Sequence, residues 1–280
     1  MPELAEIKIM AEYINSTCAN EDFTSISVSS EVVNRLGIVQ PSELQVFSIT
    51  AEARGKELIL NLLSGQNKYR LSCAMGMSGH WTISDRDNPP KHTHLKFNAI
   101  SKRSLCLVDA RRFAKWKWTK SWNNKRGPCP LSDFDNFRNH ININAHKRAF
   151  TKPIYEVLMN QSYFNGIGNY LRAEILYRLD INPFQSAWNV IVKLDKGEEL
   201  LRLCHDVCQE AYLVGGGELK DWHNPFKTGY GRGRINEKMN KLADTSFREW
   251  LQCYGKMLSI DDNKSRRFWY NEKWAYYANI

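Results

Sequence analysis

The first residues of the chain carry the groups best suited to covalent chemistry on a carbonyl carbon. Removal of Met1 would leave Pro2 as the N-terminal residue, with a secondary amine. An α-amine has a pKa of roughly 7.7–8.0, so a sizeable fraction is neutral near pH 7 and can form a Schiff base. Glu3 follows directly, and Glu6 lies one helical turn further on. Because proline and acidic residues also favour an ordinary helix start, this motif alone leaves both interpretations open.

A turn with two glycines, Gly166-Ile167-Gly168-Asn169, is the strongest local feature of the second half. Glycines let the backbone approach a ligand closely and leave N–H groups free at the start of the next helix, where a phosphate can bind. Asn169 could add a side-chain donor. A plain helix hairpin would also need a tight turn, but the double glycine flanked by asparagines favours phosphate binding.

Four further places carry a cation, an apolar side chain or both. Arg111 and Phe113 follow a predicted strand, and Met77 lies on a glycine-flanked turn; such groups can fill the void left when a base is flipped out of a duplex. Lys56, at the start of another strand, is a candidate phosphate contact or catalytic cation. Arg266 precedes three aromatic residues, as in a basic finger that enters a groove. Each feature also fits an ordinary loop, strand end or hairpin.

The composition favours a nucleic-acid-binding protein of a reducing compartment. The 280 residues are enough for two domains, and a net charge of +9 with nine Trp and twelve Tyr suggests a polyanionic partner. No apolar stretch approaches the roughly 20 residues of a membrane span, and no signal peptide is recognisable, so we expect an intracellular protein without membrane contact. Seven scattered cysteines argue against a disulfide framework. Cys204 and Cys208 lie in an apolar helical pattern, which favours core packing over a metal site.

The elements that must position these residues follow from the apolar periodicity. Residues 3–15 are predicted to form a helix, because apolar residues share one face, namely Leu4, Ile7, Ala11 and Ile14. From about 23 to 118, short β-rich runs alternate with turn signals, which predicts a β-sandwich or barrel packed against this helix. Gly127-Pro128-Cys129-Pro130, after a polar stretch, is the best linker candidate.

From about 131 to 214 the periodicity is helical. One helix is predicted to begin at Pro153 and to end before the double-glycine turn, and another begins at Tyr170. The stretch 215–241, rich in Gly, Asn, Lys and Arg, has little periodicity and is predicted to be a loop. A short helix is expected around Ser246–Cys253. Two strand-like runs then predict a β-hairpin with basic residues at its return, near 256–260 and 266–270.

Taken in order, the motifs resemble those of the Fpg/Nei family, the formamidopyrimidine-DNA glycosylases and endonucleases VIII. The resemblance spans nearly the whole chain and is carried by Pro2-Glu3-x-x-Glu6, Arg54-Gly55-Lys56, Gly76-Met77-Ser78-Gly79, Asp109-x-Arg111-Arg112-Phe113, Gly127-Pro128-x-Pro130-Leu131 and Asn160-Gln161-Ser162 through Gly166–Leu176. Within the family it is strongest to the animal Nei-like enzymes with a zincless finger, through Arg54–Leu58, Phe164–Leu179 and Trp250–Gly255. Bacterial members end in a four-cysteine zinc finger, whereas only Cys253 lies in the final 70 residues here, so we expect no metal.

The resemblance implies an α+β fold in two domains. An N-terminal helix and a β-sandwich would form a catalytic domain over residues 1–127. A helical helix–two-turn–helix (H2TH) DNA-binding domain would cover 131–280, with a C-terminal zincless β-hairpin finger at about 253–271.

The implied activity is that of a bifunctional DNA glycosylase/AP lyase of base-excision repair, working without a cofactor. Such an enzyme would excise oxidised pyrimidines and formamidopyrimidines through a Schiff base and cut the strand by β,δ-elimination. Its partner would be double-stranded DNA carrying oxidised bases or abasic sites, and we expect a monomer. The implied roles are Pro2 as nucleophile, Glu3 as acid/base, Lys56 as phosphate contact and aid to strand cleavage, Glu6 in lesion positioning, Met77, Arg111 and Phe113 in void filling, and Gly168, Asn169 and Arg266 in phosphate binding.

Two departures from the family pattern bear on the prediction. Leu4 and Ala5 replace the usual Gly and Pro; both favour helix, so Pro2 and Glu3 could be presented slightly differently. The loop 215–241 is longer and more basic than in zincless relatives, which leaves the lesion ranking, the opposite-base preference and any protein partner open. The alternatives are an 8-oxoguanine-preferring glycosylase and a catalytically silent binder of damaged or abasic DNA. Retention of both Glu3 and Lys56 argues against the silent binder.

Overall fold

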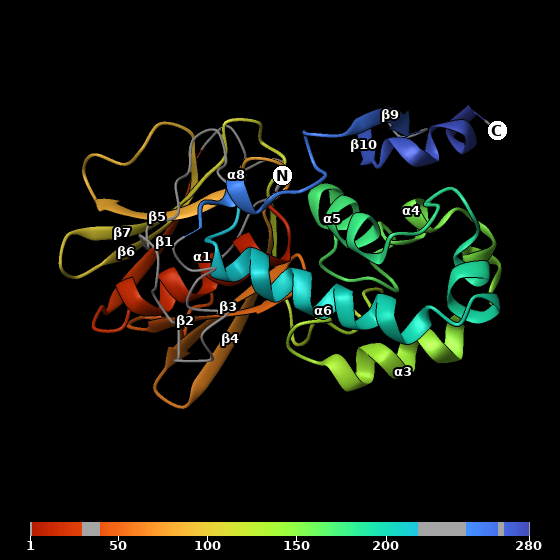
Figure 1. Ribbon diagram of the computed structural model, residues 1–280. Helices are drawn as coiled ribbons and strands as arrows, with labels where there is room; N and C mark the ends of the chain where they lie inside the picture. Colours follow the sequence, from red (N-terminus) through yellow and green to blue (C-terminus); the bar gives the residue numbers. More distant parts are fainter. Residues whose placement is uncertain (1, 30–39, 218–244, 263–265, 280) are drawn as a thin grey trace. The chain divides into compact units, whose positions relative to one another are not determined.

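The computed structural model describes residues 2–29, 40–217, 245–262 and 266–279 (Figure 1). These residues divide into two compact units. The first contains Pro2 and residues 6–123. The second contains Glu3–Ala5 and the described residues from 124 onward.

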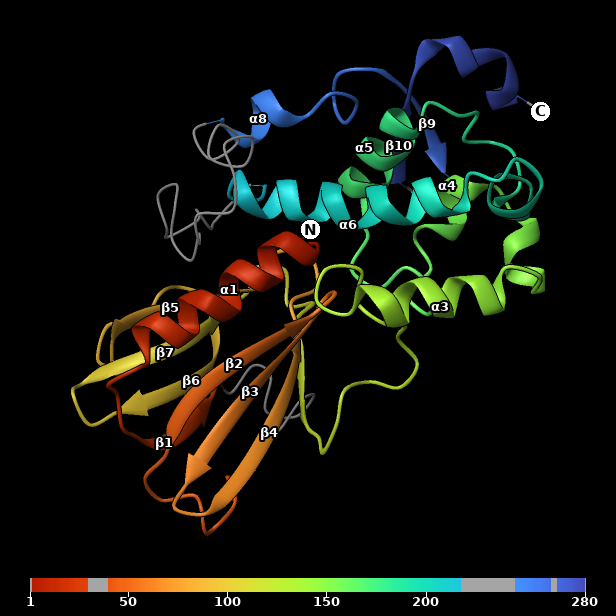
Figure 2. The same cartoon turned by 60° about the horizontal axis from the view of Figure 1, so that its bottom comes forward.

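The first unit is built on two four-stranded antiparallel sheets, with strand orders β1-β6-β7-β5 and β2-β3-β4-β8. Figure 2 shows β2, β3 and β4 side by side. The predicted β-sandwich is therefore confirmed. Its strands are β1 (Phe23–Val28), β2 (Ser48–Arg54), β3 (Glu57–Ser64), β4 (Asn67–Ala74), β5 (His80–Asp85), β6 (Thr93–Ala99), β7 (Arg103–Val108) and β8 (Lys115–Trp118).

An aromatic cluster lies at the centre of the first unit. The rings of Phe23 and Phe47 stack at a centroid distance of 5.9 Å, and Phe97 lies 6.5 Å from Phe47 and 6.0 Å from Trp81. All four side chains are at most 1% exposed. Aromatic pairs at these distances add directional contacts to the area that they bury, so this cluster fixes the packing of the strands.

Helix α1 (Leu4–Thr17) confirms the prediction for residues 3–15. The apolar face predicted from the sequence is buried, at no more than 5% exposure for any member: Leu4, Ile7, Ala11 and Ile14. Glu6 lies in the first turn, as a helix N-terminus prefers, and it too is buried.

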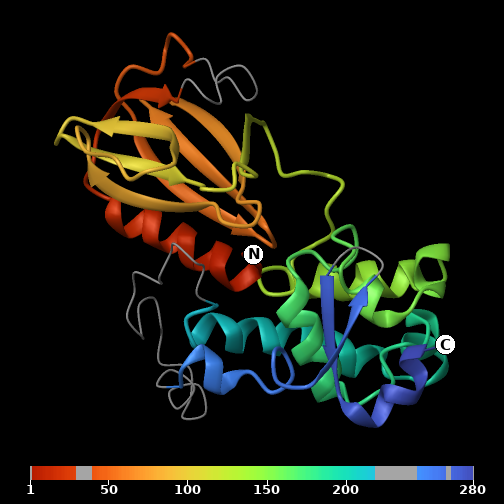
Figure 3. The ribbon, with the colours of Figure 1, turned by 90° about the horizontal axis from the view of Figure 1, so that it is seen from above.

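The second unit is helical and is centred on α5 (Asn169–Leu179). Eight of its eleven side chains are buried, so this helix has almost no polar face. It packs against α6 and against strand β10 of the C-terminal hairpin, as Figure 3 shows. The other elements are α3 (Phe134–Asn144), η1 (Arg148–Thr151), α4 (Ile154–Val157), η2 (Asn189–Lys193), α6 (Gly197–Leu213), α8 (Phe247–Trp250), β9 (Leu258–Asp262), β10 (Arg266–Tyr270) and η3 (Glu272–Asn279).

The helix predicted to begin at Pro153 is much shorter than expected. Only Ile154–Val157 is helical, because the N–H groups of Met159 and Asn160 bond to carbonyls three residues back and tighten the chain into a turn. The helix expected around Ser246–Cys253 is also limited to α8, which begins with a capping box between Ser246 and Glu249.

The predicted C-terminal hairpin is confirmed as β9 and β10, which pair antiparallel. Leu258 lies opposite Tyr270 at one end, and Asp262 lies opposite Arg266 at the other. Asp261 and Asp262, expected in the turn, belong to β9. Of the predicted loop 215–241, the part from residue 218 onward lies outside the described residues.

All seven cysteines are buried and free. Cys204 and Cys208 are fully buried on α6, which confirms the prediction that they pack in the core. Burial raises the pKa of the Cys18 and Cys253 thiols to about 12. No helix among the described residues is long and apolar enough to cross a membrane.

Candidate active site and nucleic-acid interface

Glu3 is fixed to the first turn of α5. One carboxylate oxygen, Oε1, accepts a hydrogen bond from the backbone N–H of Tyr170 at 3.1 Å, and Oε2 accepts one from Leu171 at 3.2 Å. The N-cap residue Gly168 has no side chain to satisfy these donors, so Glu3 caps the helix from 167 residues away. The side chain is only 2% exposed. The helix N-terminus stabilises its buried negative charge.

The chain before α1 is held to the same turn by its backbone. The N–H of Leu4 donates to the carbonyl of Gly166 at 3.1 Å. Pro2, which precedes Glu3, is buried. The N-terminal residues thus start a helix, as one interpretation of the motif predicted, and at the same time bring the predicted acid/base group to the double-glycine turn.

The double-glycine turn is shaped by a neighbouring carboxamide. Gly166 has φ +102°, and the Gln161 side chain accepts from its N–H at 3.0 Å and donates to the carbonyl of Ile167 at 2.9 Å. Gly168 is extended. Positive φ at Gly166 disfavours a side chain there, which explains the first glycine of the motif.

Asn169 and Arg172 connect α5 to the C-terminal hairpin. The Asn169 amide donates to the carbonyl of Arg267 at 2.8 Å, while its oxygen accepts from Arg172 at 2.6 Å. The same guanidinium nitrogen of Arg172, Nη2, lies 3.0 Å from Asp262, forming an ion pair whose side chains are 1% and 6% exposed. Asp262 also accepts from the N–H of Arg266 at 3.0 Å. Two of the three residues predicted to bind phosphate, Asn169 and Arg266, thereby lie on one hydrogen-bonded framework.

Aromatic rings enclose this ion pair. The Arg172 guanidinium lies 5.0 Å from the ring centre of Phe268, which stacks on Tyr155 at 4.8 Å and 12°. Burial lowers the pKa of Arg172, and the hydrogen bond to Asp262 opposes that shift. The hairpin is therefore anchored by a charge pair inside an aromatic shell.

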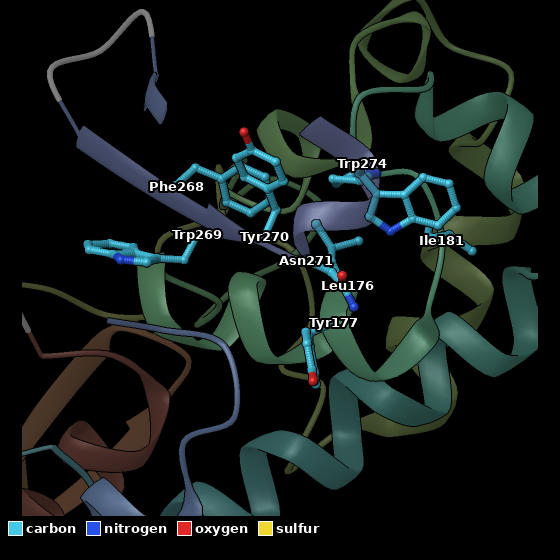
Figure 4. A pocket seen from close by; sticks show the side chains of 9 residues that line it. Leu176, Tyr177, Ile181, Phe268, Trp269, Tyr270, Asn271 and Trp274 are labelled. Atoms are coloured by element: carbon cyan, nitrogen blue, oxygen red, sulfur yellow. The ribbon is translucent and has the colours of Figure 1, made fainter. Parts of the chain in front are cut away.

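The outer side of this shell forms a shallow hollow between α5, β10 and η3, shown in Figure 4. Tyr177 of α5, Trp269 and Tyr270 of the hairpin, and Trp274 of η3 line it. Trp269 packs on Tyr254 at 4.3 Å. Among the described residues, no group of three His, Cys, Asp or Glu side chains could hold a metal ion.

Glu174 anchors the segment that leads into the hairpin. Its carboxylate is fully buried and accepts three backbone hydrogen bonds, from Gln252 at 3.0 Å and from Cys253 and Tyr254 at 2.9 Å each. Glu3, Arg172 and Glu174 thus make α5 the element to which the N-terminus and the hairpin are tied.

In the first unit, Lys56 lies in the two-residue turn between β2 and β3, where Arg54 pairs with Glu57. Gly55, the first turn residue, has φ +58°, as tight hairpin turns require. Lys56 is half-buried.

The predicted void-filling residues lie on two loops that touch. Met77, in the turn between β4 and β5, is 42% exposed, and Phe113, after β7, is 47% exposed. A Cβ added at Gly76 would lie 2.6 Å from the Cβ of Phe113, so the loops are in close contact. The Arg111 guanidinium lies 4.9 Å from the Phe113 ring centre. The structure thus brings these three predicted residues together.

Sequence reasoning assigned no role to three buried ionisable residues that organise the site: Asp109, Arg172 and Glu174. Each belongs to a quoted motif. The available signal was a charged residue within an apolar run, which is costly to bury unless it is paired.

The chain matches known proteins over almost its whole length. A family model described as the formamidopyrimidine-DNA glycosylase N-terminal domain matches residues 1–116. Human Endonuclease 8-like 1 is 36% identical over 299 residues, which cover 96% of this chain and 72% of the human protein. Formamidopyrimidine-DNA glycosylase of Marinobacter nauticus is 29% identical over 239 residues, which cover 82% of this chain and 85% of that protein. The solved structure of MutM (Fpg) from Thermus thermophilus superposes with a TM-score of 0.73 at 20% identity. The superposition covers 97% of this chain and 98% of that one.

The similarity to the human protein and the fold place the chain plainly: it belongs to the Fpg/Nei family and is a DNA glycosylase of that family. The predicted resemblance to the animal Nei-like members is confirmed by the human relative. A crystal structure of Lactococcus lactis Fpg, named as a complex with Fapy-dG-containing DNA, has the same fold, with a TM-score of 0.71 at 22% identity over 97% of this chain and 98% of that one.

Proposed function

We propose that this chain is a bifunctional DNA glycosylase/AP lyase that excises oxidised pyrimidines and formamidopyrimidines from double-stranded DNA. The observation that carries the proposal is Glu3, bonded to the first turn of α5 directly after the phosphate-binding turn and adjacent in sequence to Pro2. A fixed carboxylate beside an amine nucleophile is the arrangement that acid/base-assisted covalent catalysis requires.

The chemistry follows from the identity of the nucleophile. After removal of Met1, the neutral amine of Pro2 attacks C1′ of the damaged nucleotide and the base leaves. Glu3 serves as acid/base at the sugar, and Glu6 helps to position the flipped nucleotide. The Schiff base acidifies the C2′ proton, so that elimination cuts the strand on the 3′ side and then, with Lys56 assisting, on the 5′ side. A glycosylase that used water would leave the strand intact.

Binding is divided between the two units. We assign Asn169, the backbone N–H of Gly168 and the side chain of Arg266 to phosphates around the lesion, because Asn169 and Arg266 lie on one framework at the N-terminus of α5, which follows Gly168. Met77, Arg111 and Phe113 fill the space left by the flipped nucleotide. We propose that one copy of the chain suffices, in two domains over about 1–127 and 131–280.

The test is borohydride trapping on a duplex that contains an oxidised base. Borohydride reduces a Schiff base to a stable amine, so wild type should give a covalent protein–DNA adduct. The adduct should be lost in protein that retains Met1, while Glu12→Gln, on the same helix, should trap like wild type. If wild type leaves no adduct on any lesion or abasic site, the lyase mechanism is wrong.

The lesion preference needs a separate panel. The names of the relatives support both endonuclease VIII-type and formamidopyrimidine substrates. We therefore expect faster excision of thymine glycol and formamidopyrimidines than of 8-oxoguanine in otherwise identical duplexes. Faster excision of 8-oxoguanine would contradict this preference without affecting the trapping result.

A further inference from the structure

Asp109 joins two loops of the first unit. It follows β7 directly and is fully buried, at 0% exposure, although it borders the exposed loop that carries Arg111 and Phe113. A buried carboxylate is costly unless several donors satisfy it. The role of Asp109 therefore depends on which groups supply those donors.

The donors come from both loops. Oδ1 accepts a hydrogen bond from the Ser78 hydroxyl, in the turn before β5, and another from the N–H of Arg111 at 3.2 Å. Oδ2 accepts from the N–H of Ala114 at 2.6 Å. The backbone carbonyl of Asp109 lies 2.8 Å from Nε2 of the buried His94, which fixes the base of the loop.

The Ser78 hydrogen bond is thus a polar link between the Met77 turn and the loop after β7. It acts together with the close packing of Gly76 against Phe113. Gly76 has a φ of +62°, and a Cβ added there would lie 2.6 Å from the Cβ of Phe113, so there is no room for a side chain at position 76. Met77 and Phe113, both exposed, project from these two linked loops.

We propose that Asp109 and Ser78 are positioning residues that hold Met77, Arg111 and Phe113 as one preformed wedge, which enters the duplex as a unit. The inference rests on the proposed function, since a void exists only when a nucleotide leaves a duplex. Opening a base step costs free energy, and a preformed wedge loses less conformational freedom on insertion than two separate loops.

The test compares two abasic substrates. Ser78→Ala removes the link between the loops while Asp109 keeps both backbone donors. Ser64→Ala is the matched control, because its hydroxyl also bonds across loops, to the Glu43 carbonyl at 3.4 Å, away from the wedge. The measurement is the rate of borohydride-trapped adduct formation on an abasic site in a duplex and in a single strand, which has no stacked void to fill.

We expect Ser78→Ala to slow trapping on the duplex by about tenfold, the scale of one lost hydrogen bond to a charged group. The single-strand rate should stay within about twofold of wild type, a change below the effect of one such hydrogen bond, and Ser64→Ala should match wild type on both substrates. A second readout is the coupling between Met77 and Phe113. The effects of Met77→Ala and Phe113→Ala on the duplex trapping rate should be non-additive when Ser78 is present. They should become additive when Ser78→Ala is also present.

Equal trapping by Ser78→Ala and wild type on the duplex would overturn the wedge, as would an equal loss on both substrates, which indicates a general structural defect. Absence of adduct from wild type on both substrates is a different result: it overturns the proposed function, and this inference falls with it.

Discussion

Glu3 has a structural role, as the cap of α5, beside the catalytic role that we propose for it. Its oxygens bond to the N–H groups of Tyr170 and Leu171, so the residue proposed to move protons also completes a helix N-terminus that has no capping side chain of its own. The proposed chemistry and the capping of α5 therefore involve the same carboxylate. Substitution at this position should affect both.

The first prediction is that Glu3→Gln lowers the free energy of unfolding as well as the activity. The amide offers one oxygen in place of two and carries no charge, so one buried N–H donor is left unsatisfied, at a cost of about 1–3 kcal/mol. Urea unfolding measures the change. Glu12→Gln, which removes the charge from a partly exposed pair with Lys8, should cost under about 1 kcal/mol. An unfolding free energy for Glu3→Gln equal to that of wild type would show that the capping bonds contribute nothing.

At the scale of elements, α5 is the framework on which the proposed phosphate contacts are held. Arg172 and Glu174 reach from this helix to Asp262 and to residues 252–254, so the hairpin is held by polar bonds inside an aromatic shell. Buried side chains supply the attachment.

Asp262→Asn should therefore be strongly destabilising. It leaves the Arg172 charge buried without its partner, which costs about 3–5 kcal/mol. The exposed pair Arg138–Glu198 provides the control, since Arg138→Met should change the unfolding free energy by no more than about 1 kcal/mol. Thermal or urea unfolding of the two variants decides the matter: similar small effects would mean that the buried pair does not anchor the hairpin.

The hairpin should also be insensitive to chelators. Only Cys253 lies in the final 70 residues, so four thiolate ligands cannot be assembled there. We expect elemental analysis to find less than one zinc per chain and EDTA to leave the unfolding temperature unchanged. Stoichiometric zinc, or unfolding on chelation, would contradict a zincless finger.

The sequence predicted these elements unevenly. The apolar face of α1 and the strand-like runs of β9 and β10 are local signals, so all three elements were predicted within a few residues. The helix from Pro153 was overestimated because its end depends on tightened hydrogen bonds at Met159 and Asn160, which apolar spacing does not encode. Asp109 and Glu3 were recognised as motif members, but their bonding partners, up to 168 residues away, follow only from tertiary structure.

At the scale of the whole molecule, charge governs the encounter with DNA. The chain carries 39 Lys and Arg against 30 Asp and Glu, and phosphate contacts by such residues release counterions. The logarithm of the affinity for a lesion-containing duplex should therefore fall steeply and linearly with the logarithm of the salt concentration.

Arg266→Ala should reduce the steepness of that plot by about 0.9, the contribution of one phosphate contact. Arg202→Ala removes an exposed arginine of α6 that pairs with Glu198, and it should leave the slope unchanged. Fluorescence anisotropy titrations at four salt concentrations measure both slopes. Equal slopes for Arg266→Ala and wild type would place Arg266 away from the DNA.

The measurement that tests the central claim most directly is tandem mass spectrometry of the borohydride-trapped adduct. The claim is that the amine of Pro2, exposed by removal of Met1, is the nucleophile. The account predicts that the deoxyribose remnant is found on the nitrogen of Pro2 in the N-terminal peptide and on no lysine. An adduct on Lys56 or another lysine, or on a peptide that still carries Met1, would contradict it.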